Sequence, residues 1–351
     1  MTQAFGPMTF GLAVLSLTAS AAGVWVSIRL AYKRGVMDFP NERSSHSVPT
    51  PRMGGIAMVA AAVLSFACWV FLVPGEIFWV RAVWAGPLFA LVMSGLGLWD
   101  DLSDLSPRFR FSVQIAGSVA ILLLLAMRVP SFRLGGYSVP SLIWVPVGAI
   151  WIVWMLNLYN FMDGIDGLAG GEAAVASSFF FVLFAREGEL GWAVANLLVA
   201  ASAMGFLVHN WPPARVFMGD AGSAFLGAFY GMQSVLAPLS TKVPFIVLVL
   251  PFANFILDTT VTLFRRVWRG EKWYQAHRTH FYQRMTNLGM SHKKITVLEL
   301  LSVGVCCISA EICMRVDGKY MICMVVFILL LFFGAGAWIT GKERRSVPNS
   351  I

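Results

Sequence analysis

Charged residues are scarce in this sequence. Asp, Glu, Lys and Arg together make up 13% of the 351 residues, whereas 58% are hydrophobic. Soluble domains carry about 25% charged residues, so this chain could not cover a water-exposed surface in the usual way. Its mean hydropathy of +0.73 points in the same direction. The composition therefore excludes a soluble globular domain and predicts an integral membrane protein.

Cysteine is also rare, and the sequence lacks internal repeats and low-complexity segments. The five cysteines lie in apolar stretches without a C-x-x-C pair: Cys68, Cys306, Cys307, Cys313 and Cys323. Their spacing excludes a disulfide scaffold and carries no zinc signature, so we expect buried, reduced thiols. Without a repeat or a shift in composition, we expect one polytopic membrane domain over 1–342 and a short C-terminal tail at 343–351.

Long apolar runs, in contrast, are abundant. Each is about twenty residues long, which is enough for an α-helix to cross the hydrocarbon core of a bilayer. They lie roughly at 8–31, 53–73, 80–99, 111–128, 141–158, 168–186, 191–208, 221–239, 243–264, 295–314 and 320–340. The sequence therefore predicts an all-α integral membrane protein with about eleven transmembrane helices.

The basic residues set the expected orientation. No Lys or Arg precedes the first apolar run, and Lys33 and Arg34 follow it, which is the reverse of a cleavable signal peptide. With the N-terminus outside and the C-terminus cytoplasmic, most of the 26 Lys and Arg residues lie inside. The formal charge of +8 then reflects topology and gives no reason to expect a nucleic-acid partner. The expected cytoplasmic loops are about 33–52, 100–110, 157–168, 209–221 and 265–294.

One of these loops carries four polar side chains at every third position. They are Asn157, Asn160, Asp163 and Asp166. If the preceding helix continues through them they share one side of it, and Gly164 and Gly167 allow a turn or a close approach to a ligand. Carboxylates at a membrane edge are costly and favour a functional interpretation. The alternative is a helix-capping turn, although four polar groups exceed what capping needs.

Two further loops are acidic. Asp100, Asp101 and Asp104 would share a helix face, and three close carboxylates need a cation or a proton between them. This indicates a Mg²⁺ site or a general base, the alternative being a solvated turn with Arg108 and Arg110 as counter-ions. Asp220 lies between two glycines at the start of an apolar run, where a helix N-terminus favours an anion or an anion with its metal; it could also be a simple N-cap.

Two basic loops contain candidate phosphate ligands. Arg43, His46 and Arg52 lie in a proline-rich loop and could converge on a phosphate. His277, Arg278 and His280 have the chemistry to recognise a pyrophosphate. Each could instead be an ordinary basic inner loop. All the acidic loops nevertheless fall on the same expected side of the membrane, which favours one composite site.

Four motifs together resemble the polyprenyl-phosphate N-acetylhexosamine-1-phosphate transferases. This group of glycosyltransferase family 4 is related to phospho-N-acetylmuramoyl-pentapeptide transferase. The resemblance covers roughly residues 35–290. The motifs are Ser45-His46-Ser-Val-Pro49-Thr-Pro51-Arg52-Met-Gly54-Gly55, Asp100-Asp101 with Asp104-Leu-Ser-Pro107, Asn157-x-x-Asn160-x-x-Asp163-Gly-x-Asp166-Gly-Leu, and Phe217-Met-Gly-Asp220-x-Gly-Ser223.

The resemblance implies an enzyme. Such enzymes transfer a sugar-1-phosphate from a UDP-sugar to polyprenyl phosphate and release UMP. It implies Mg²⁺, with Mn²⁺ as an alternative, a multi-pass location in the bacterial inner membrane, and an active site on the cytoplasmic face. A homodimer is compatible with it.

The resemblance also implies roles for individual residues. Asp220 is the leading Mg²⁺ ligand, together with Asp100, and Asp100 or Asp101 deprotonates or positions the lipid phosphate. The nucleotide and the metal are held by the loop that contains Asn157, Asn160, Asp163 and Asp166, with Asp163 and Asp166 among the catalytic groups. His277, Arg278 and His280 clamp the diphosphate, and His46 and Arg52 bind substrate.

Two departures narrow the group. Asp258 followed by Arg265-Arg266 is typical of the N-acetylhexosamine branch, and the run of consecutive histidines of the muramoyl branch is missing. Only Arg278 and His280 match the D-R-x-H-x-H-H run of many hexosamine enzymes. The Ala-His-Arg-x-His-x-Tyr-Gln pattern looks like the subgroup that initiates O-antigen chains in lipopolysaccharide biosynthesis. Some of its members use a 6-deoxy sugar such as UDP-N-acetylfucosamine or UDP-N-acetylquinovosamine.

Two other classes of membrane protein fit the sequence less well. A transporter or lipid flippase would carry its acids near mid-depth in paired, broken helices, whereas here they cluster at loop edges. A CDP-alcohol phosphotransferase would need D-x-x-D-G-x-x-A-R, and the segment Asp163–Gly170 lacks the arginine.

Overall fold

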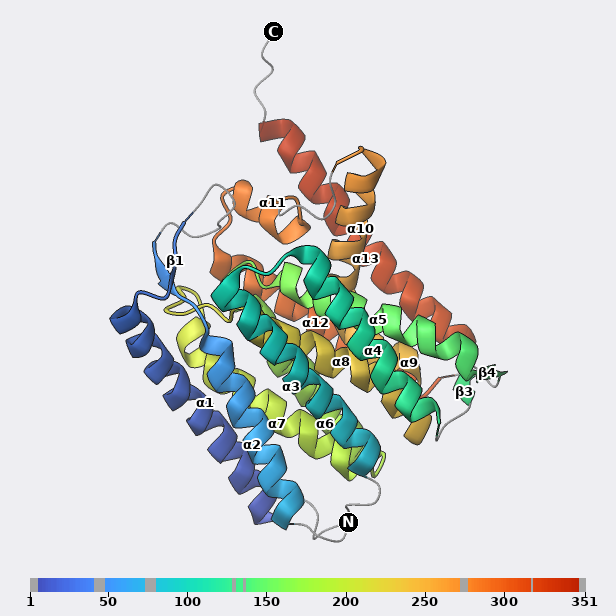
Figure 1. The fold of residues 1–351 in the computed structure, drawn as a ribbon. Helices are drawn as coiled ribbons and strands as arrows, with labels where there is room; N and C mark the ends of the chain where they lie inside the picture. Colours follow the sequence, from blue (N-terminus) through green and yellow to red (C-terminus); the bar gives the residue numbers. More distant parts are fainter. Residues whose placement is uncertain are drawn as a thin grey trace.

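The protein is a bundle of long helices (Figure 1). The computed structural model describes residues 6–40, 48–72, 80–127, 131–134, 137–271, 277–316 and 318–346. The long helices are α1 (Pro7–Arg34), α2 (Gly54–Leu72), α3 (Val80–Ser103), α4 (Pro107–Ala126), α5 (Ser141–Met162), α6 (Leu168–Arg186), α7 (Leu190–Asn210), α8 (Asp220–Ser240), α10 (Ala253–Trp268), α12 (His292–Cys313) and α13 (Gly318–Ser346).

The remaining elements are short. They are the helices α9 (Phe245–Val249), η1 (Leu250–Phe252) and α11 (Phe281–Asn287), and the strands β1 (Met37–Asp38), β2 (Thr50–Pro51), β3 (Ser131–Leu134) and β4 (Tyr137–Pro140). The strands form two antiparallel hairpins, β1 with β2 and β3 with β4. Sheet is therefore a minor part of the described chain, and the prediction of an all-α membrane protein is confirmed.

Each of the eleven expected spans contains a long helix, with one interruption. Within the described residues, nine segments are long and apolar enough to cross a membrane, and α3 and α8 are not among them. The expected span at 243–264 is broken into α9, η1 and α10, and η1 contains Pro251, which cannot donate a helical hydrogen bond. The number of spans and their orientation remain predictions.

Helix α8 lies at the centre of the bundle, and almost all of its residues are buried. Small residues let its neighbours approach closely, as is common in membrane bundles. A Cβ on Gly97 of α3 would lie 2.3 Å from the carbonyl oxygen of Asp220, and one on Gly55 of α2 would lie 2.6 Å from Cα of Gly222. The N-terminus of α8 is thus packed directly against α3 and α2.

The thiols are only partly where we expected them. All five cysteines are free, and Cys306, Cys307 and Cys313 of α12 are buried. The expectation of burial is wrong for Cys68 and Cys323, which are exposed on α2 and α13. These two side chains lie on the outer faces of their helices, where a bilayer would cover them.

One end of the bundle collects the polar loops. Helix α3 ends there, α4 begins, α5 ends and α8 begins, and the β1–β2 hairpin and α11 lie at the same end (Figure 1, top). We call it the site end.

Candidate active site

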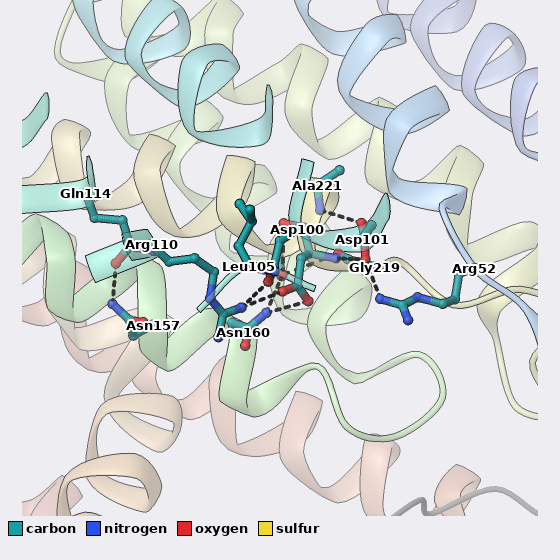
Figure 2. A network of polar contacts seen from close by, with 12 residues as sticks. Arg52, Asp100, Asp101, Leu105, Arg110, Gln114, Asn157, Asn160, Gly219 and Ala221 are labelled. Carbon is teal, nitrogen blue, oxygen red and sulfur yellow. Dashed lines mark hydrogen bonds and ion pairs between the residues drawn. The ribbon is translucent and has the colours of Figure 1, made fainter. Parts of the chain in front are cut away.

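Asp101 caps the N-terminus of α8 from a different helix (Figure 2). Its Oδ1 accepts a hydrogen bond from the backbone N–H of Asp220 and its Oδ2 accepts one from Ala221, each at 3.1 Å. The N-cap residue Gly219 has no side chain for this task and has a φ of 76°. Because carboxylates stabilise helix N-termini, Asp101 fixes where α8 begins.

Arg52 holds Asp101 from the other side. Its Nη2 donates to Asp101 Oδ1 at 2.8 Å, and the Asp101 side chain is fully buried. Burial alone would lower the pKa of Arg52, but the hydrogen bond and charge of Asp101 raise it overall. The loop that carries Arg52 is tied to the loop before α8, since Phe217 N–H donates to Pro51 at 2.8 Å and Gly54 N–H donates to Phe217 at 3.0 Å.

Arg110 contacts two further acids, Asp100 and Asp220. Its Nη1 donates to Asp100 Oδ2 and, at 3.0 Å, to Asp220 Oδ2. Asn160 Nδ2 donates to the second oxygen of Asp220 at 2.9 Å, and Leu105 N–H donates to Asp100 Oδ1 at 2.8 Å. Side chains from α3, α4, α5 and α8 therefore meet at one point (Figure 2).

A small cavity opens beside this meeting point. Its volume is about 30 Å³, and its polar lining comprises Asp100, Arg110, Gln114, Asn157, Asn160 and Asp220. Asn157 lies one turn below Asn160 and donates to Gln114 Oε1 at 2.8 Å. Asp101 does not line the cavity, because its oxygens are committed to α8 and Arg52. Asp100 and Asp220 are thus the acids best placed to meet a small ligand.

Asp163 differs from the other acids. Among the described residues, none donates a hydrogen bond to its carboxylate. Loss of contact with water, followed by repulsion from Asp220 and Asp101, raises the pKa of Asp163 well above its usual value. It therefore belongs electrostatically to the cluster and is the member still available to a cation or a proton.

Asp166, in contrast, ties the loops together. Its Oδ2 accepts from the N–H of Ala214 at 3.0 Å, and its Oδ1 lies 3.2 Å from His292 Nδ1 of α12. Burial raises the pKa of Asp166, but these two partners outweigh burial and lower it overall. Its two oxygens are bound to other loops and it does not line the small cavity, so the structure does not bring it together with the cluster around Asp220.

The loop at 277–280 lies beside the end of α5. The ring of Phe161 is 5.9 Å from that of His280 and 6.4 Å from that of His277, and Tyr282 Oη donates to the carbonyl of Phe161 at 2.9 Å. Gly164 allows this approach, because an added Cβ would lie 2.0 Å from Tyr282 Oη. The loop therefore borders the segment that carries Asp163.

Asp258 organises this loop. Its Oδ1 lies 3.0 Å from His280 Nδ1 and accepts from the N–H of Phe281 at 2.9 Å, while its Oδ2 accepts from Tyr282 N–H at 3.2 Å. His280 is thereby fixed at the N-terminus of α11.

Three nitrogens of the loop are buried. Among the described residues, His277 Nε2, His280 Nε2 and Arg278 Nε have no hydrogen-bond partner. Burial, with added repulsion from His280 and Arg266, lowers the pKa of His277 to about 4. The loop can therefore offer both neutral and cationic nitrogen groups to an anion.

One expectation from the sequence is wrong, and another falls on residues that the structure does not describe. Asp104 does not share a helix face with Asp100 and Asp101: α3 ends at Ser103, and Asp104 is exposed with a φ of 46°. The chain must turn here to reach Pro107, which opens α4 behind the N-cap Ser106 as expected. His46 and Arg43 lie outside the described residues, so their expected role stays a prediction.

Sequence reasoning missed three positions. Arg110 was considered only as a counter-ion, yet it bridges two acids from different helices. His292 lies in the expected loop 265–294 and received no role, yet it holds Asp166. Asp258 was used only to place the chain within its group. Its place ten residues before Trp268 on an amphipathic helix could have signalled a buried acid in need of partners.

The donor set is suited to a divalent cation shared with a substrate. Among the described residues, no group of three or more His, Cys, Asp or Glu side chains is arranged to hold a metal ion alone. Mg²⁺ commonly binds through one or two carboxylates together with water and substrate phosphates. Asp220 and the unpaired Asp163 provide such carboxylates, so the residues fit Mg²⁺ bound jointly with a phosphate.

Known proteins are similar to this sequence. The family model described as Glycosyl transferase family 4 matches residues 83–237. A Bacillus subtilis protein named probable undecaprenyl-phosphate N-acetylglucosaminyl 1-phosphate transferase is 30% identical, over 89% of this chain and 87% of its own. The decaprenyl-phosphate N-acetylglucosaminephosphotransferase of Mycolicibacterium smegmatis is 33% identical, over 84% of this chain and 79% of its own.

A more distant relative also aligns along most of its length. The undecaprenyl-phosphate alpha-N-acetylglucosaminyl 1-phosphate transferase of Escherichia coli K12 is 24% identical, over 92% of this chain and 90% of its own. The matched region 83–237 contains the acids of α3 and α8 and the polar end of α5, which are the elements that build the cluster. On this sequence and this geometry, the chain belongs to glycosyl transferase family 4.

Proposed function

We propose that this protein transfers N-acetylhexosamine-1-phosphate from a UDP-sugar to polyprenyl phosphate. The products are a polyprenyl-pyrophosphoryl sugar and UMP. The names of the three relatives support the reaction class, because each contains a polyprenyl-phosphate acceptor and a sugar phosphate transfer.

One observation carries the proposal. Asp100, Asp220, Asn160 and Arg110 meet beside a small cavity at the end of a membrane bundle. A site at such an edge is open to a water-soluble nucleotide and to a lipid whose tail stays in the bilayer. Acids for a cation and a base, next to an arginine for a phosphate, are the groups that phosphoryl transfer requires.

The reaction is a displacement at phosphorus. An oxygen of the lipid phosphate attacks the phosphorus that carries the sugar, and the bond from that phosphorus to the bridging oxygen breaks, so UMP leaves with that oxygen. Arg110 would bind the lipid phosphate and exchange its present contacts with Asp100 and Asp220 for the incoming oxygens. Asp100, freed from Arg110, can then position the phosphate or accept its proton.

Mg²⁺ would supply positive charge that offsets the phosphate oxygens as negative charge shifts to the leaving UMP. Asp220 and Asp163 are the residues that would hold it. Asp101 acts indirectly, because it fixes the N-terminus of α8 and hence the place of Asp220.

The diphosphate of the UDP-sugar would bind to the loop at 277–280. The loop has free nitrogens on His277, Arg278 and His280, and the rings of its two histidines lie near Phe161, two residues before Asp163. The leaving group would then lie beside the end of α5, and the lipid phosphate would lie at Arg110. The basic loops suggest that the site end faces the cytoplasm, where UDP-sugars are made.

The sugar and the pathway need a direct test. The relatives' names contain N-acetylglucosamine, which makes UDP-N-acetylglucosamine the first donor to test. The Ala-His-Arg-x-His-x-Tyr-Gln pattern favours O-antigen initiation and keeps the 6-deoxy donors UDP-N-acetylfucosamine and UDP-N-acetylquinovosamine as alternatives.

A donor panel tests the proposal. Membranes that contain the protein would receive polyprenyl phosphate, Mg²⁺ and one UDP-N-acetylhexosamine at a time, each labelled in its sugar. We expect label in the lipid extract with at least one donor, and the preferred donor identifies the sugar. Membranes that contain the E. coli relative serve as the positive control. If these form labelled lipid and membranes with this protein form none with any donor, the proposed transferase activity is refuted and the transporter alternative is favoured.

A further inference from the structure

The outermost helix, α13, is only loosely packed along its length. Little of its apolar span is buried within the protein. A cavity of about 330 Å³ separates it from α10 and α12, with walls that include Phe332 and Ala335 of α13 and Leu298 and Ser302 of α12. Apolar packing alone therefore does not fix the position of α13 on the bundle.

Its site end, in contrast, is held by a buried arginine of α11. Arg284 Nε donates to Glu343 Oε1 at 2.8 Å, and its Nη2 donates to Glu343 Oε2 at 2.6 Å. The same Nη2 donates to Thr340 Oγ1 at 2.8 Å. Only 7% of Arg284 is exposed, whereas the Glu343 side chain is 35% exposed, so the buried arginine is held by a two-point ion pair at the edge of the protein, which is a directional contact.

Aromatic contacts add to the packing between α11 and α13. The guanidinium of Arg284 lies 4.8 Å from the centre of the Phe281 ring, which meets the ring of Phe332 edge-on at 5.2 Å. A Cβ on Gly336 would lie 3.0 Å from Phe281, so α13 approaches α11 closely here. Helix α11 is thus bound to α13 on one side.

On its other side, α11 is bound to the site. His280 precedes its first residue, Asp258 accepts hydrogen bonds from its first two N–H groups, and Tyr282 Oη reaches the end of α5. The helix has only seven residues, so it cannot hold its shape without these anchors. A shift of α11 at Arg284 would therefore move His280 and Tyr282.

We infer that Arg284 and Glu343 are positioning residues. Together they make α13 a strut that holds α11, and with it the loop at 277–280, in the geometry that binds the diphosphate. The inference rests on the proposed function for the role of that loop, but the strut itself can be measured without any substrate.

The kinetic test uses Glu343→Gln, which keeps the size of the side chain and removes its charge. We expect the KM for the UDP-sugar to rise about tenfold, the factor that corresponds to roughly 1.4 kcal/mol. The KM for polyprenyl phosphate and kcat should change less than about twofold, because α11 is not placed at the lipid phosphate. Arg284→Gln should act in the same way, and the double variant should add little to either.

Glu311→Gln is the matched control. Glu311 of α12 also pairs with arginines, Arg186 at 2.8 Å and Arg315 at 2.5 Å, but it lies at the end of α12 away from the site. We expect this variant to keep the wild-type KM values. The inference would be overturned if Glu343→Gln lowered kcat and raised both KM values by the same factor. It would also be overturned if the variant lowered only the fraction of folded protein, because the pair would then have a general structural role.

Amide hydrogen exchange tests whether α13 holds α11 in place without relying on enzyme activity. Without nucleotide, the amides of α11 should exchange at least about fivefold faster in Glu343→Gln than in the wild type, while α12 and the Glu311→Gln variant stay unchanged. Unchanged exchange in α11 would overturn the inference even if the enzyme is active. If the wild-type protein neither binds UDP nor forms product, the proposed function fails, and the exchange result still decides whether the strut exists.

Discussion

The acids at the site end carry different numbers of hydrogen bonds, and this separates their roles. Asp101 has both oxygens bound to backbone N–H groups and to Arg52. Asp166 is bound to Ala214 and His292, whereas Asp163 receives no hydrogen bond from any described residue. A carboxylate bound to backbone N–H groups and to neighbouring loops holds the structure, whereas the unpaired Asp163, and Asp100 and Asp220 beside the cavity, can serve a ligand.

Asp163 and Asp166 should therefore respond differently to the same change. Asp163→Asn should leave the protein as stable as the wild type or slightly more stable, because it removes a carboxylate whose charged form is disfavoured by burial and by repulsion from Asp220 and Asp101. Turnover should fall by roughly 100-fold or more, as when one charge-stabilising group is lost. Asp166→Asn should instead cost about 1–3 kcal/mol of stability, because it weakens a buried hydrogen-bonded pair.

Thermal unfolding in detergent and initial rates measured on the same samples compare the two. A stable Asp166→Asn with low activity and an unstable Asp163→Asn with normal activity would reverse our assignment.

Arg110 is the cation nearest to the two acids that line the small cavity. Arg110→Gln should raise the KM for polyprenyl phosphate by roughly tenfold or more, because it removes a charge-assisted contact to phosphate. Arg108→Gln is the matched control, since Arg108 lies on the same turn but is exposed. Rates measured against polyprenyl phosphate concentration check the prediction. An equal effect of both variants would mean that only the net charge of the loop matters.

His277 makes a testable contribution to the pH dependence of stability. Its pKa is lowered from 6.5 to about 4 in the folded protein, first by burial and then by His280 and Arg266. The unfolded chain therefore binds more protons between these two values, and folding loses stability as the pH falls through 6.5. In His277→Gln the fall in Tm between about pH 7.5 and pH 5 should be smaller than in the wild type. An identical fall would show that His277 is not buried in the neutral form.

Sequence reasoning found these residues better than it found their partners. Asp100, Asp101, Asp163 and Asp220 stand out because carboxylates are rare in an apolar chain. Sequence reasoning could not assign a role to each of these acids. The partner of Asp101, for example, is the N-terminus of a helix that starts 119 residues later. Arg110 was underestimated for the same reason: its contact with Asp220 exists only once α4 and α8 are packed.

At the scale of helices, the site depends on the contact between α3 and α8. Gly97 lies against the carbonyl of Asp220, and Asp101, one turn further along α3, caps the start of α8. The two helices therefore fit together only if position 97 carries no side chain.

Gly97→Ala should force the two helices apart. Its Cβ would lie 2.3 Å from the Asp220 carbonyl oxygen, and such overpacking typically costs about 1–3 kcal/mol. Activity should fall further than stability, because the cap between Asp101 and Asp220 is strained directly. Gly95→Ala is the control in the same helix, since its added Cβ would meet no atom within 4 Å. Unfolding and turnover of both variants give the test, and a fully active Gly97→Ala would contradict the packing.

The lengths of the apolar runs predicted where the helices lie, but they did not predict where some of the helices end. The turn at Asp104 and the break at η1 depend on where α4 and α10 must pack, and proline positions alone did not reveal them. The end of α13 is a similar case. Residue 343 was expected to begin a tail, and α13 continues through it to Ser346, with Glu343 bound to Arg284.

For the whole molecule, the sequence predicted the membrane class and the gathering of polar loops at one end. Alternation of apolar spans predicts every second loop on the same side, so the acids of 100–101, 157–166 and 220 were expected at one end of the protein. This clustering favours an enzyme over the transporter alternative, because the cluster joins the ends of four helices. The fold alone would not identify the reaction, which depends on the site and on the relatives.

The central claim is that the sugar moves together with its phosphate. It is tested most directly with a UDP-N-acetylhexosamine that carries ³²P in the phosphate attached to the sugar. With purified protein, Mg²⁺ and polyprenyl phosphate, we predict ³²P in the lipid product and one unlabelled UMP released for each labelled lipid. Labelled UDP released with an unlabelled lipid would mean that the sugar is transferred without its phosphate, which would contradict the account.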